Sequence, residues 1–436
     1  MRGHTLGDAP KKMLAQVIRE ERLGEPADAY RVEEVEVPAP AADEVLVRVM
    51  AAGVNYSGVF AATGRPVNVF SLRRRAGDPG DFHIAGSDAS GVVWATGQDV
   101  KHLRVGDEVV LHCGVWDSAC PFIRGGGDPT LSETFRVWGY ETNWGSFAEF
   151  TKVKAAQCMP KARHLSWEES AVTTVVGATA YRMLTHWQPH HVQPGDVVLI
   201  WGGAGGLGSA AIQLVRAMKG IPIAVTSGAE RIEFCRRLGA AACIDRKNFD
   251  HWGPIPDPGE KARYERWRAG LSEFARAIRE SIGERRSPRI VFEHPGCETL
   301  PTSLFVCAAG GMIVTCGATT GHTSGIDLRY LWVRQKRLQG SHFANQEEAL
   351  AFNRMVIGGE IDPCLSKTYS FEETPHAHQS LKDKSAPVGK AAIKIGSTAH
   401  DGATRQVSVN KSRDGAGSSE ESALRTHDHR SGGGDS

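Results

Sequence analysis

The chain has 436 residues, a length that predicts two or three domain-sized units. Its 51 lysines and arginines balance 50 aspartates and glutamates to a formal charge of +1, which argues against binding nucleic acid or membranes through general basicity. The nine cysteines are scattered without CxxC pairs, which disfavours a disulfide framework and a structural zinc site. Because the N-terminus lacks a signal-peptide core and no apolar run is long enough to span a membrane, we expect a soluble cytoplasmic protein.

The first part of the chain is rich in strand signals. From about residue 14 to 155, short runs of strand-forming residues alternate with turns made of proline, glycine and aspartate, which predicts a β-rich domain. A helix is expected at residues 167–187, with Ser166 as its N-cap. Near the end, helical patterns and the strand VGKAAIKI return to the first domain. We therefore assign residues 1–190 and 346–396 to one domain.

Residues 191–345 show a different pattern, in which apolar strands alternate with helical stretches. This predicts a parallel sheet with helices on both faces, and therefore an α/β protein. Residues 249–275 interrupt the pattern with proline, glycine and alternating charge, so we expect a partly helical, exposed insertion. Residues 397–436 contain too few large aliphatic side chains to offset an ordering entropy of about 1 to 2 kcal/mol per residue, which predicts a disordered tail.

The strongest motif lies at residues 196–218, where a buried strand runs into a GxGxxG turn and then a helix. In such a turn the first glycine permits the tight bend, the second lets the backbone approach a pyrophosphate and the third lets the helix pack closely. The alternative is a glycine-rich loop that serves only the strand-to-helix geometry. The context favours a doubly wound Rossmann domain, with the phosphates at the helix N-terminus. The predicted cofactor residues here are Gly203, Gly205, Gly206, Leu207 and Gly208.

The end of the next strand distinguishes the two nicotinamide cofactors. An acidic residue about 20 positions onward would bind a ribose 2′-hydroxyl and repel a 2′-phosphate. Ser227 stands there instead, with Arg231 one helical turn later and Arg246 as a weaker candidate, and this pattern favours NADPH. Alternatively, Arg231 is a solvated helix residue paired with Glu230 or Glu233.

The layout, together with GSDASGVV at residues 86–93, resembles the medium-chain dehydrogenase/reductase superfamily over about residues 14–396. The resemblance implies a GroES-like β-rich catalytic domain beside the Rossmann domain. Zinc alcohol dehydrogenases of this superfamily have a metal-binding cysteine in the loop where this chain has Gly53-Val54-Asn55-Tyr56. Because that cysteine is absent, we expect no metal, and reduction of an activated alkene is favoured over carbonyl chemistry.

More specific blocks are VNY, GYETNWGSFAEF, ATAYRML, VFEHPG, RYLW and GSHFAN. Together they resemble the crotonyl-CoA carboxylase/reductase branch. The resemblance implies that NADPH delivers hydride to the β-carbon of a 2-enoyl-CoA. The α-carbon of the resulting enolate then attacks CO2, which gives an alkylmalonyl-CoA, a compound of the kind that serves as a polyketide extender unit.

Carbon dioxide gains negative charge on its oxygens as its carbon is attacked, so its site needs preorganised donors away from water. In the family, residues matching Asn55, Glu149 and His342 hold CO2, and an apolar neighbour of the glutamate shields the enolate from water. Here Ala148 directly precedes the glutamate and Phe147 comes before it, which leaves the ratio of carboxylation to simple reduction open. The alternatives are a turn-supporting Asn55, a solvent-facing Glu149 and a buried structural His342.

The remaining expectations concern the thioester. The resemblance assigns Arg329 and Tyr330 to the adenine end of CoA, whereas an Arg–Tyr pair at a domain or subunit seam is the alternative. Tyr56, beside Asn55, is expected to contact the substrate. Three further residues are expected near the nicotinamide: Thr179, Cys316 and Phe343.

Two other functions stay open at this point. A plain enoyl-thioester or quinone reductase would protonate the enolate with water, and a non-catalytic NADPH-binding protein would oxidise no cofactor. The family's habit implies a homodimer or homotetramer. The acyl chain length is not fixed by the sequence.

Overall fold

The computed structural model describes residues 6–78 and 80–396, so the tail predicted at residues 397–436 lies outside the described residues. A six-stranded sheet forms within residues 191–345, and every neighbouring pair in it is parallel. Its order is β13 (Ala242–Asp245), β12 (Ile221–Thr226), β11 (Val197–Trp201), β14 (Ile290–Glu293), β15 (Met312–Thr315) and β16 (Arg337–Gly340). The order runs outward from β11 in both directions, which confirms the predicted doubly wound Rossmann fold.

Helices cover both faces of this sheet because its central strands, β11 and β14, are buried on both faces. Along β11, Val198 and Ile200 pack on one side with side chains of four helices, and Leu199 and Trp201 pack on the other side with side chains of two. The first group is α6 (Thr174–Thr185), α7 (Gly206–Ala217), α8 (Ala229–Arg237) and α12 (Gln346–Ile357). The second group is α9 (Lys261–Ser281) and α10 (Leu300–Val306).

The insertion predicted at residues 249–275 contains the start of α9. Four apolar side chains of α9 recur every three or four residues and are buried, while most of the helix is exposed. They are Trp267, Leu271, Phe274 and Ile278. The insertion is therefore exposed on one side only, and its apolar face docks on the sheet.

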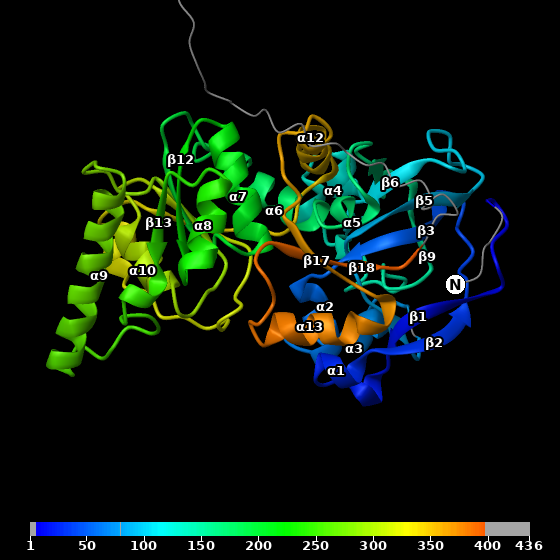
Figure 1. The fold of residues 1–436 in the computed structure, drawn as a ribbon, viewed down its shortest axis with the longest axis horizontal. Helices are drawn as coiled ribbons and strands as arrows, with labels where there is room; N and C mark the ends of the chain where they lie inside the picture. Colours follow the sequence, from blue (N-terminus) through cyan, green and yellow to red (C-terminus); the bar gives the residue numbers. More distant parts are fainter. Residues whose placement is uncertain (1–5, 79, 397–436) are drawn as a thin grey trace, which may run out of the picture. The chain divides into compact units, whose positions relative to one another are not determined.

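The β-rich part is built on a seven-stranded sheet. Its strands in order are β10 (Cys158–Pro160), β6 (Glu108–Leu111), β5 (Ala89–Thr96), β3 (Glu44–Gly53), β18 (Lys390–Lys394) and β17 (Leu365–Tyr369), with β9 (Phe150–Lys154) also paired to β3. In Figure 1 the orange strands β17 and β18 lie beside the blue strand β3. The C-terminal strand VGKAAIKI thus returns to the first sheet as predicted, while the boundaries at residues 190 and 345 stay a prediction.

Smaller elements complete the described residues. A three-stranded sheet has the order β2 (Arg31–Glu36), β1 (Lys12–Ile18) and β4 (His83–Ile84), and β7 (Gly114–Val115) pairs with β8 (Arg136–Val137). The other helices are α1 (Pro26–Ala29), α2 (Tyr56–Thr63), α3 (Val69–Arg75), α4 (Pro121–Arg124), α5 (Trp167–Ser170), α11 (Leu328–Trp332) and α13 (Thr374–Lys382). No helix among the described residues is both long and apolar enough to cross a bilayer.

One predicted element differs from the structure. The single helix expected at residues 167–187 is two helices, α5 and α6. Ser166 does cap α5, in a capping box with Glu169. The helix breaks before α6, where the Thr173 hydroxyl donates to the Ser170 carbonyl at 3.0 Å and competes with the backbone for it. The break starts a new helix whose N-terminal Val175 N–H donates to Asp88.

Candidate active site

The glycine turn lies between β11 and α7, at the carboxyl end of the central strand. Gly205 is the N-cap of α7, which begins at Gly206. A Cβ atom on Gly208 would lie 2.3 Å from the Gly202 carbonyl oxygen, whereas one on Gly205 would meet nothing closer than 3.5 Å. The third glycine is therefore needed for packing, and the second leaves its side open at a helix N-terminus, as a pyrophosphate requires.

The residues predicted to select NADPH over NADH follow the neighbouring strands β12 and β13. Arg231 is directed toward the Ala386 carbonyl, 3.4 Å from its guanidinium, and not toward Glu230 or Glu233. Arg246 forms an ion pair with Glu298 at 2.5 Å, so part of its charge is already neutralised.

One acid near this turn was not predicted from the sequence. Asp245, at the end of β13, accepts hydrogen bonds from the backbone N–H groups of Gly228 at 3.3 Å and Lys247 at 2.9 Å. Its carboxylate therefore stabilises the backbone turns at Gly228 and Lys247. Ser227 comes directly after β12 and is half-buried.

Asn55 lies at the start of α2 and is 8% exposed. Its side-chain oxygen accepts a hydrogen bond from Lys390 Nζ at 2.5 Å, and its amide nitrogen donates to Asp88 Oδ2 at 3.3 Å. Asp88 Oδ1 in turn accepts from the Val175 N–H at 3.4 Å, at the N-terminus of α6. Neither Asp88 nor Lys390 was singled out from the sequence, because a carboxylate and an ammonium so far apart along one chain show no pattern.

Burial shifts the pKa of both charged groups beside Asn55. Loss of hydration raises the pKa of Asp88 to about 6, against the opposing effect of the Lys390 charge. Loss of hydration likewise lowers the pKa of Lys390 to about 8, against the opposing effect of Asp88. Near pH 7 both groups are charged and form a buried pair around one amide.

His342 is an exposed residue in the loop after β16, in which Ser341 and Ala344 are buried, and its ring lies 5.6 Å from that of Phe135 and 4.6 Å from that of Phe343. Partial loss of hydration, and then the charge of Arg182, lower the pKa of His342. Phe343 has a φ of 49°, which is uncommon for a side chain of that size. The loop is anchored by His112, whose Nε2 donates to the Ala344 carbonyl at 3.0 Å while its Nδ1 accepts from the Gly114 N–H.

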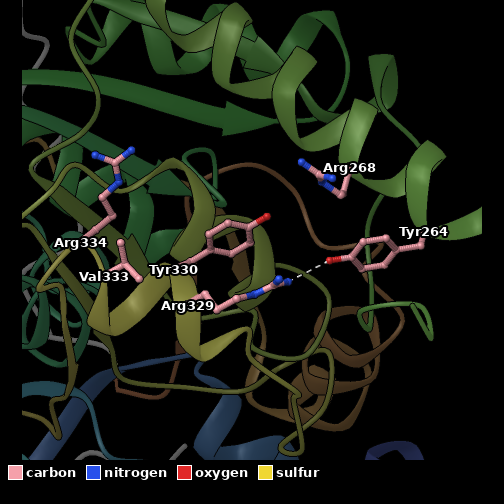
Figure 2. Close-up of a pocket in the computed structure, with 6 residues that line it drawn as sticks. All are labelled: Tyr264, Arg268, Arg329, Tyr330, Val333 and Arg334. Atoms are coloured by element: carbon pink, nitrogen blue, oxygen red, sulfur yellow. Dashed lines mark hydrogen bonds between the residues drawn. The ribbon is translucent and has the colours of Figure 1, made fainter. Parts of the chain in front are cut away.

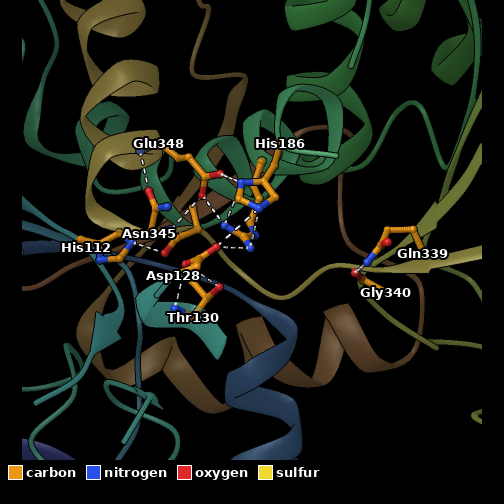
Figure 3. A network of polar contacts seen from close by, with 10 residues as sticks. His112, Asp128, Thr130, His186, Gln339, Gly340, Asn345 and Glu348 are labelled. Atoms are coloured by element: carbon orange, nitrogen blue, oxygen red, sulfur yellow. Dashed lines mark hydrogen bonds and ion pairs between the residues drawn. The ribbon is translucent and has the colours of Figure 1, made fainter. Parts of the chain in front are cut away.

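A buried polar network holds the far end of the same loop. Arg182 is 1% exposed and donates to Asp128 at 2.7 Å and to Glu348 at 2.8 Å. Glu348 also contacts His186 Nδ1 at 2.6 Å and closes a capping box with Asn345 at the start of α12. Figure 3 shows the Asp128, His186 and Glu348 side chains converging from three parts of the chain. The network therefore fixes the loop that carries His342.

Glu149 is held between two strands of the β-rich part, β1 and β3. Its carboxylate accepts from the Leu14 N–H at 2.8 Å, and its carbonyl pairs with the Val49 N–H in β3. Asn55 comes six residues after Val49, which is roughly 20 Å along an extended chain.

The two residues before Glu149 are buried elsewhere. Phe147 is 1% exposed, and its ring lies 4.9 Å from that of His378 and 6.0 Å from that of Tyr30. Ala148 is fully buried and pairs with Ala15. Both are packed in the hydrophobic cores of the β-rich part.

A second carboxylate of the same sequence block has different surroundings and was not predicted from the sequence. Tyr140 and Phe343 pack against one apolar cluster, which contains Cys113, Phe135 and Val137. Glu141 comes after Tyr140 and accepts from the Val137 N–H at 2.8 Å. Loss of hydration raises the pKa of Glu141, which favours a carboxyl that keeps its proton to higher pH.

The remaining predicted residues are dispersed around these groups. Thr179 is 7% exposed, and its hydroxyl donates to the Val175 carbonyl at 2.6 Å, one turn along α6 from the Asp88 contact. Cys316 comes directly after β15, and burial raises its thiol pKa to about 12. Tyr56 opens α2, and its ring lies 5.4 Å from that of Phe60.

A separate cavity of about 390 Å³ lies between α9 and α11. Figure 2 shows its lining residues, Tyr264, Arg268, Arg329, Tyr330, Val333 and Arg334. Arg329 pairs with Asp327 at 2.7 Å and donates to the Tyr264 hydroxyl at 3.2 Å. Three guanidinium groups and two phenol rings in one cavity match the phosphates and the base of a nucleotide.

Among the described residues, no group of three or more histidine, cysteine, aspartate or glutamate side chains is arranged to hold a metal ion. Two family models match the chain. Residues 41–163 match the alcohol dehydrogenase GroES-like domain, and residues 206–356 match the zinc-binding dehydrogenase domain.

Two curated relatives match over most of the chain. A crotonyl-CoA carboxylase/reductase from Cereibacter sphaeroides is 46% identical over 390 residues, covering 89% of each chain. A crotonyl-CoA reductase from Streptomyces collinus is 42% identical and covers 82% of this chain and 80% of that one.

Solved structures agree with the curated relatives. Crotonyl-CoA carboxylase/reductase AntE in complex with NADP has a TM-score of 0.86 at 52% identity, covering 90% of this chain and 97% of that one. The 2-octenoyl-CoA carboxylase reductase CinF, in complex with NADP and 2-octenoyl-CoA, has a TM-score of 0.81 at 38% identity, covering 89% and 88%.

Proposed function

The chain belongs to the crotonyl-CoA carboxylase/reductase branch of the medium-chain dehydrogenase/reductase superfamily, and on that premise we propose that it reductively carboxylates a 2-enoyl-CoA with NADPH. The observation that carries this function is 46% identity to a crotonyl-CoA carboxylase/reductase over 89% of both chains. Relatives of this branch act at one double bond, and the buried donor cluster at Asn55 supplies the polar site that such chemistry needs.

The reaction forms two bonds on the substrate. When bound, NADPH supplies a hydride, and the β-carbon of the 2-enoyl thioester receives it. The electron pair of the double bond then resides on the α-carbon and thioester oxygen as an enolate. The α-carbon attacks CO2, and the new carboxylate makes the product an alkylmalonyl-CoA without any proton from water.

The residues around the site stabilise the negative charge that develops on the oxygens of CO2. The Asn55 amide nitrogen is a donor for an oxygen of CO2, and the His342 imidazole is a second donor. Glu141, with its raised pKa, replaces Glu149 as the carboxyl we assign to this site. The apolar rings of Tyr140 and Phe343 beside them exclude water, which would otherwise protonate the enolate.

The cofactor assignment rests on the glycine turn and on the residues directly after β12. The open side of Gly205 at the N-terminus of α7 suits a pyrophosphate. A 2′-phosphate would find the Ser227 hydroxyl and the Arg231 guanidinium, and no acid stands directly after β12. Because Arg246 is paired with Glu298, we expect it to contribute less than Arg231 to binding the 2′-phosphate. Thr179 and Cys316 remain candidates for the nicotinamide end.

We assign the cavity between α9 and α11 to the nucleotide end of CoA. Arg329 and Tyr330 were expected there, and Arg268 and Tyr264 add a second charge and a second ring from α9. The family resemblance leaves the acyl chain open between crotonyl and longer groups, because CinF accommodates an octenoyl chain at 38% identity to this protein.

Further proposals concern assembly and compartment. β16 is the edge strand of its sheet, and apolar side chains on and near it are exposed, which favours a homodimer formed by a second copy at this edge. Those side chains are Leu328, Trp332, Val333 and Leu338. All nine cysteines are free thiols, and this favours the reducing cytoplasm.

The experiment that tests the function monitors NADPH oxidation with crotonyl-CoA and with 2-octenoyl-CoA, each with and without bicarbonate plus carbonic anhydrase. Mass analysis then identifies the products. We expect a product heavier than the saturated acyl-CoA by one CO2 when bicarbonate is present. A saturated acyl-CoA as the sole product would indicate a plain reductase, and tight NADPH binding without oxidation would indicate a binding protein.

A further inference from the structure

Lys390 is a buried cation that no sequence pattern marked. It is the first residue of β18, is 6% exposed, and its ammonium donates to the Val54 carbonyl at 2.8 Å and to Asn55 Oδ1 at 2.5 Å. Burying an ammonium group costs free energy unless its hydrogens form hydrogen bonds. These two contacts offset part of that cost. The charge that balances it belongs to Asp88, which is fully buried on the other side of Asn55.

The two charges fix which way the Asn55 amide faces. An ammonium can only donate and a carboxylate can only accept, so the amide oxygen turns to Lys390 and the amide nitrogen to Asp88. The flipped amide would place N–H groups against the ammonium and an oxygen against the carboxylate. Both contacts of the amide nitrogen are long, at 3.3 Å to Asp88 and 3.4 Å to the Gly53 carbonyl. Its hydrogens therefore remain available to a better placed acceptor.

The backbone of Lys390 is tied to the nucleotide turn. The Gly389 N–H donates to the Ala204 carbonyl at 2.8 Å, and Gly389 pairs with Gly205. A Cβ atom on Gly206 would lie 2.3 Å from Lys390 Cδ, so the lysine stem lies directly against the start of α7. One side chain thus spans from the glycine turn to the Asn55 amide.

We propose that Lys390 is a positioning residue for carboxylation, which holds the Asn55 amide with its nitrogen toward CO2 and is itself held by the nucleotide turn. This inference rests on the proposed function. The charge states agree with it: with the Lys390 pKa near 8 and the Asp88 pKa near 6, both groups are ionised at neutral pH. Without the ammonium, only the two long contacts of the amide nitrogen, to Asp88 and to the Gly53 carbonyl, distinguish the nitrogen of Asn55 from its oxygen.

The test is a Lys390→Met variant of the full chain, which keeps the length of the stem and removes its donors. At saturating NADPH, we expect the ratio of carboxylated to reduced acyl-CoA to fall roughly tenfold, the range of a lost hydrogen bond to a charged group. Lys394→Met is the matched control, because Lys394 is an exposed lysine of the same strand that pairs with Glu168 at 3.9 Å. That control keeps the product ratio of the unaltered protein.

A double-mutant cycle separates positioning from a general structural role. If Lys390 acts through Asn55, Lys390→Met lowers the ratio in the unaltered protein but adds no further loss in an Asn55→Ala background. Equal losses in both backgrounds would overturn the proposal, as would an unchanged ratio with weakened NADPH binding, which would leave Lys390 as a cofactor contact only.

A third variant covers the case in which Lys390→Met fails to fold because Asp88 is left unpaired. Lys390→Met with Asp88→Asn removes both charges, and we expect it to bind and oxidise NADPH with the same low ratio. A high ratio in this variant contradicts the proposal. If the unaltered protein itself makes only reduced acyl-CoA, the proposed function fails and this inference fails with it, whereas carboxylation that survives both variants overturns this inference alone.

Discussion

Two glutamates of one sequence block, Glu141 and Glu149, have opposite surroundings. Glu141 lies after a turn that packs against the cluster touching His342, and loss of hydration raises its pKa. Glu149 lies between two strands, where its carboxylate accepts from the Leu14 N–H. These surroundings favour Glu141 over Glu149 as the carboxyl of the proposed site.

We therefore expect Glu141→Gln to lower the carboxylated share of the product, with turnover falling about 10²-fold, as for loss of one preorganised polar group. Glu149→Gln is the matched control, and it should leave the product ratio unchanged. Mass analysis of both product mixtures measures the carboxylated share. A shift with Glu149→Gln and none with Glu141→Gln would reverse the assignment.

At this scale the sequence indicates segments of interest, but not which of their residues meet in the fold. The block GYETNWGSFAEF was identified, yet the different surroundings of its two glutamates depend on how β9 pairs with β3 and on the turn after β8. Asp88 and Lys390 were missed because their meeting depends on the return of the C-terminal strand to β3. Such contacts are set by tertiary structure and carry no local pattern.

Among the elements, α6 and α12 are joined by a buried ion network. Arg182 is 1% exposed and pairs with Asp128 and Glu348. Arg182→Met leaves two carboxylates without their cation, so we expect the free energy of unfolding to fall by about 3 to 5 kcal/mol. Chemical denaturation measures it.

Arg236→Met is the control for this prediction, because Arg236 is 62% exposed and pairs with Glu233 within one helix at 3.9 Å. This substitution should lower the free energy of unfolding by less than about 0.5 kcal/mol. Similar losses in the two variants would mean that the network contributes no more than a surface pair.

The glycine turn makes a prediction about packing. Gly208→Ala would place a methyl group 2.3 Å from the Gly202 carbonyl oxygen, and we expect a loss of about 1 to 3 kcal/mol in stability. Gly205→Ala meets nothing closer than 3.5 Å, so it should fold normally but bind NADPH more weakly. Thermal denaturation with and without NADPH separates the effects. Gly325→Ala, with nothing within 4 Å, is the control, and an equally stable Gly208→Ala would contradict the packing argument.

Elements with a strong local pattern were predicted well, and the Rossmann strands and the turn into α7 are the clearest cases. The break between α5 and α6 was not predicted, because it depends on the Thr173 hydroxyl and on Asp88, a residue far along the chain. Helical periodicity continues across such a break, so it gives no signal.

For the whole molecule, buried neutral histidines predict how stability depends on pH. Loss of hydration lowers the pKa of His112, His294 and His378 to about 4 each. Unfolded histidines take up protons near pH 6.5, so the unfolded state binds more protons between about pH 6.5 and 4. The free energy of unfolding should therefore fall as the pH falls through that range. Asp88, Glu141 and Glu293, whose pKa values burial raises, oppose this trend, whereas His83 and His251, whose pKa values burial lowers, add to it.

Urea denaturation from about pH 7 to about pH 4 measures this slope. His112→Gln should flatten it, because one buried histidine is removed, and His164→Gln, at an exposed position, should not. A stability that stays constant on acidification would contradict the account.

The central claim is that hydride and CO2 add to the same double bond. The most direct test supplies NADPH deuterated at its transferable position together with carbon-13 bicarbonate and carbonic anhydrase, and examines the product of crotonyl-CoA by NMR. The account predicts one product with deuterium at the β-carbon and a carbon-13 carboxylate on the α-carbon. Deuterium at the β-carbon with a second hydrogen on the α-carbon in place of the carboxylate would contradict it.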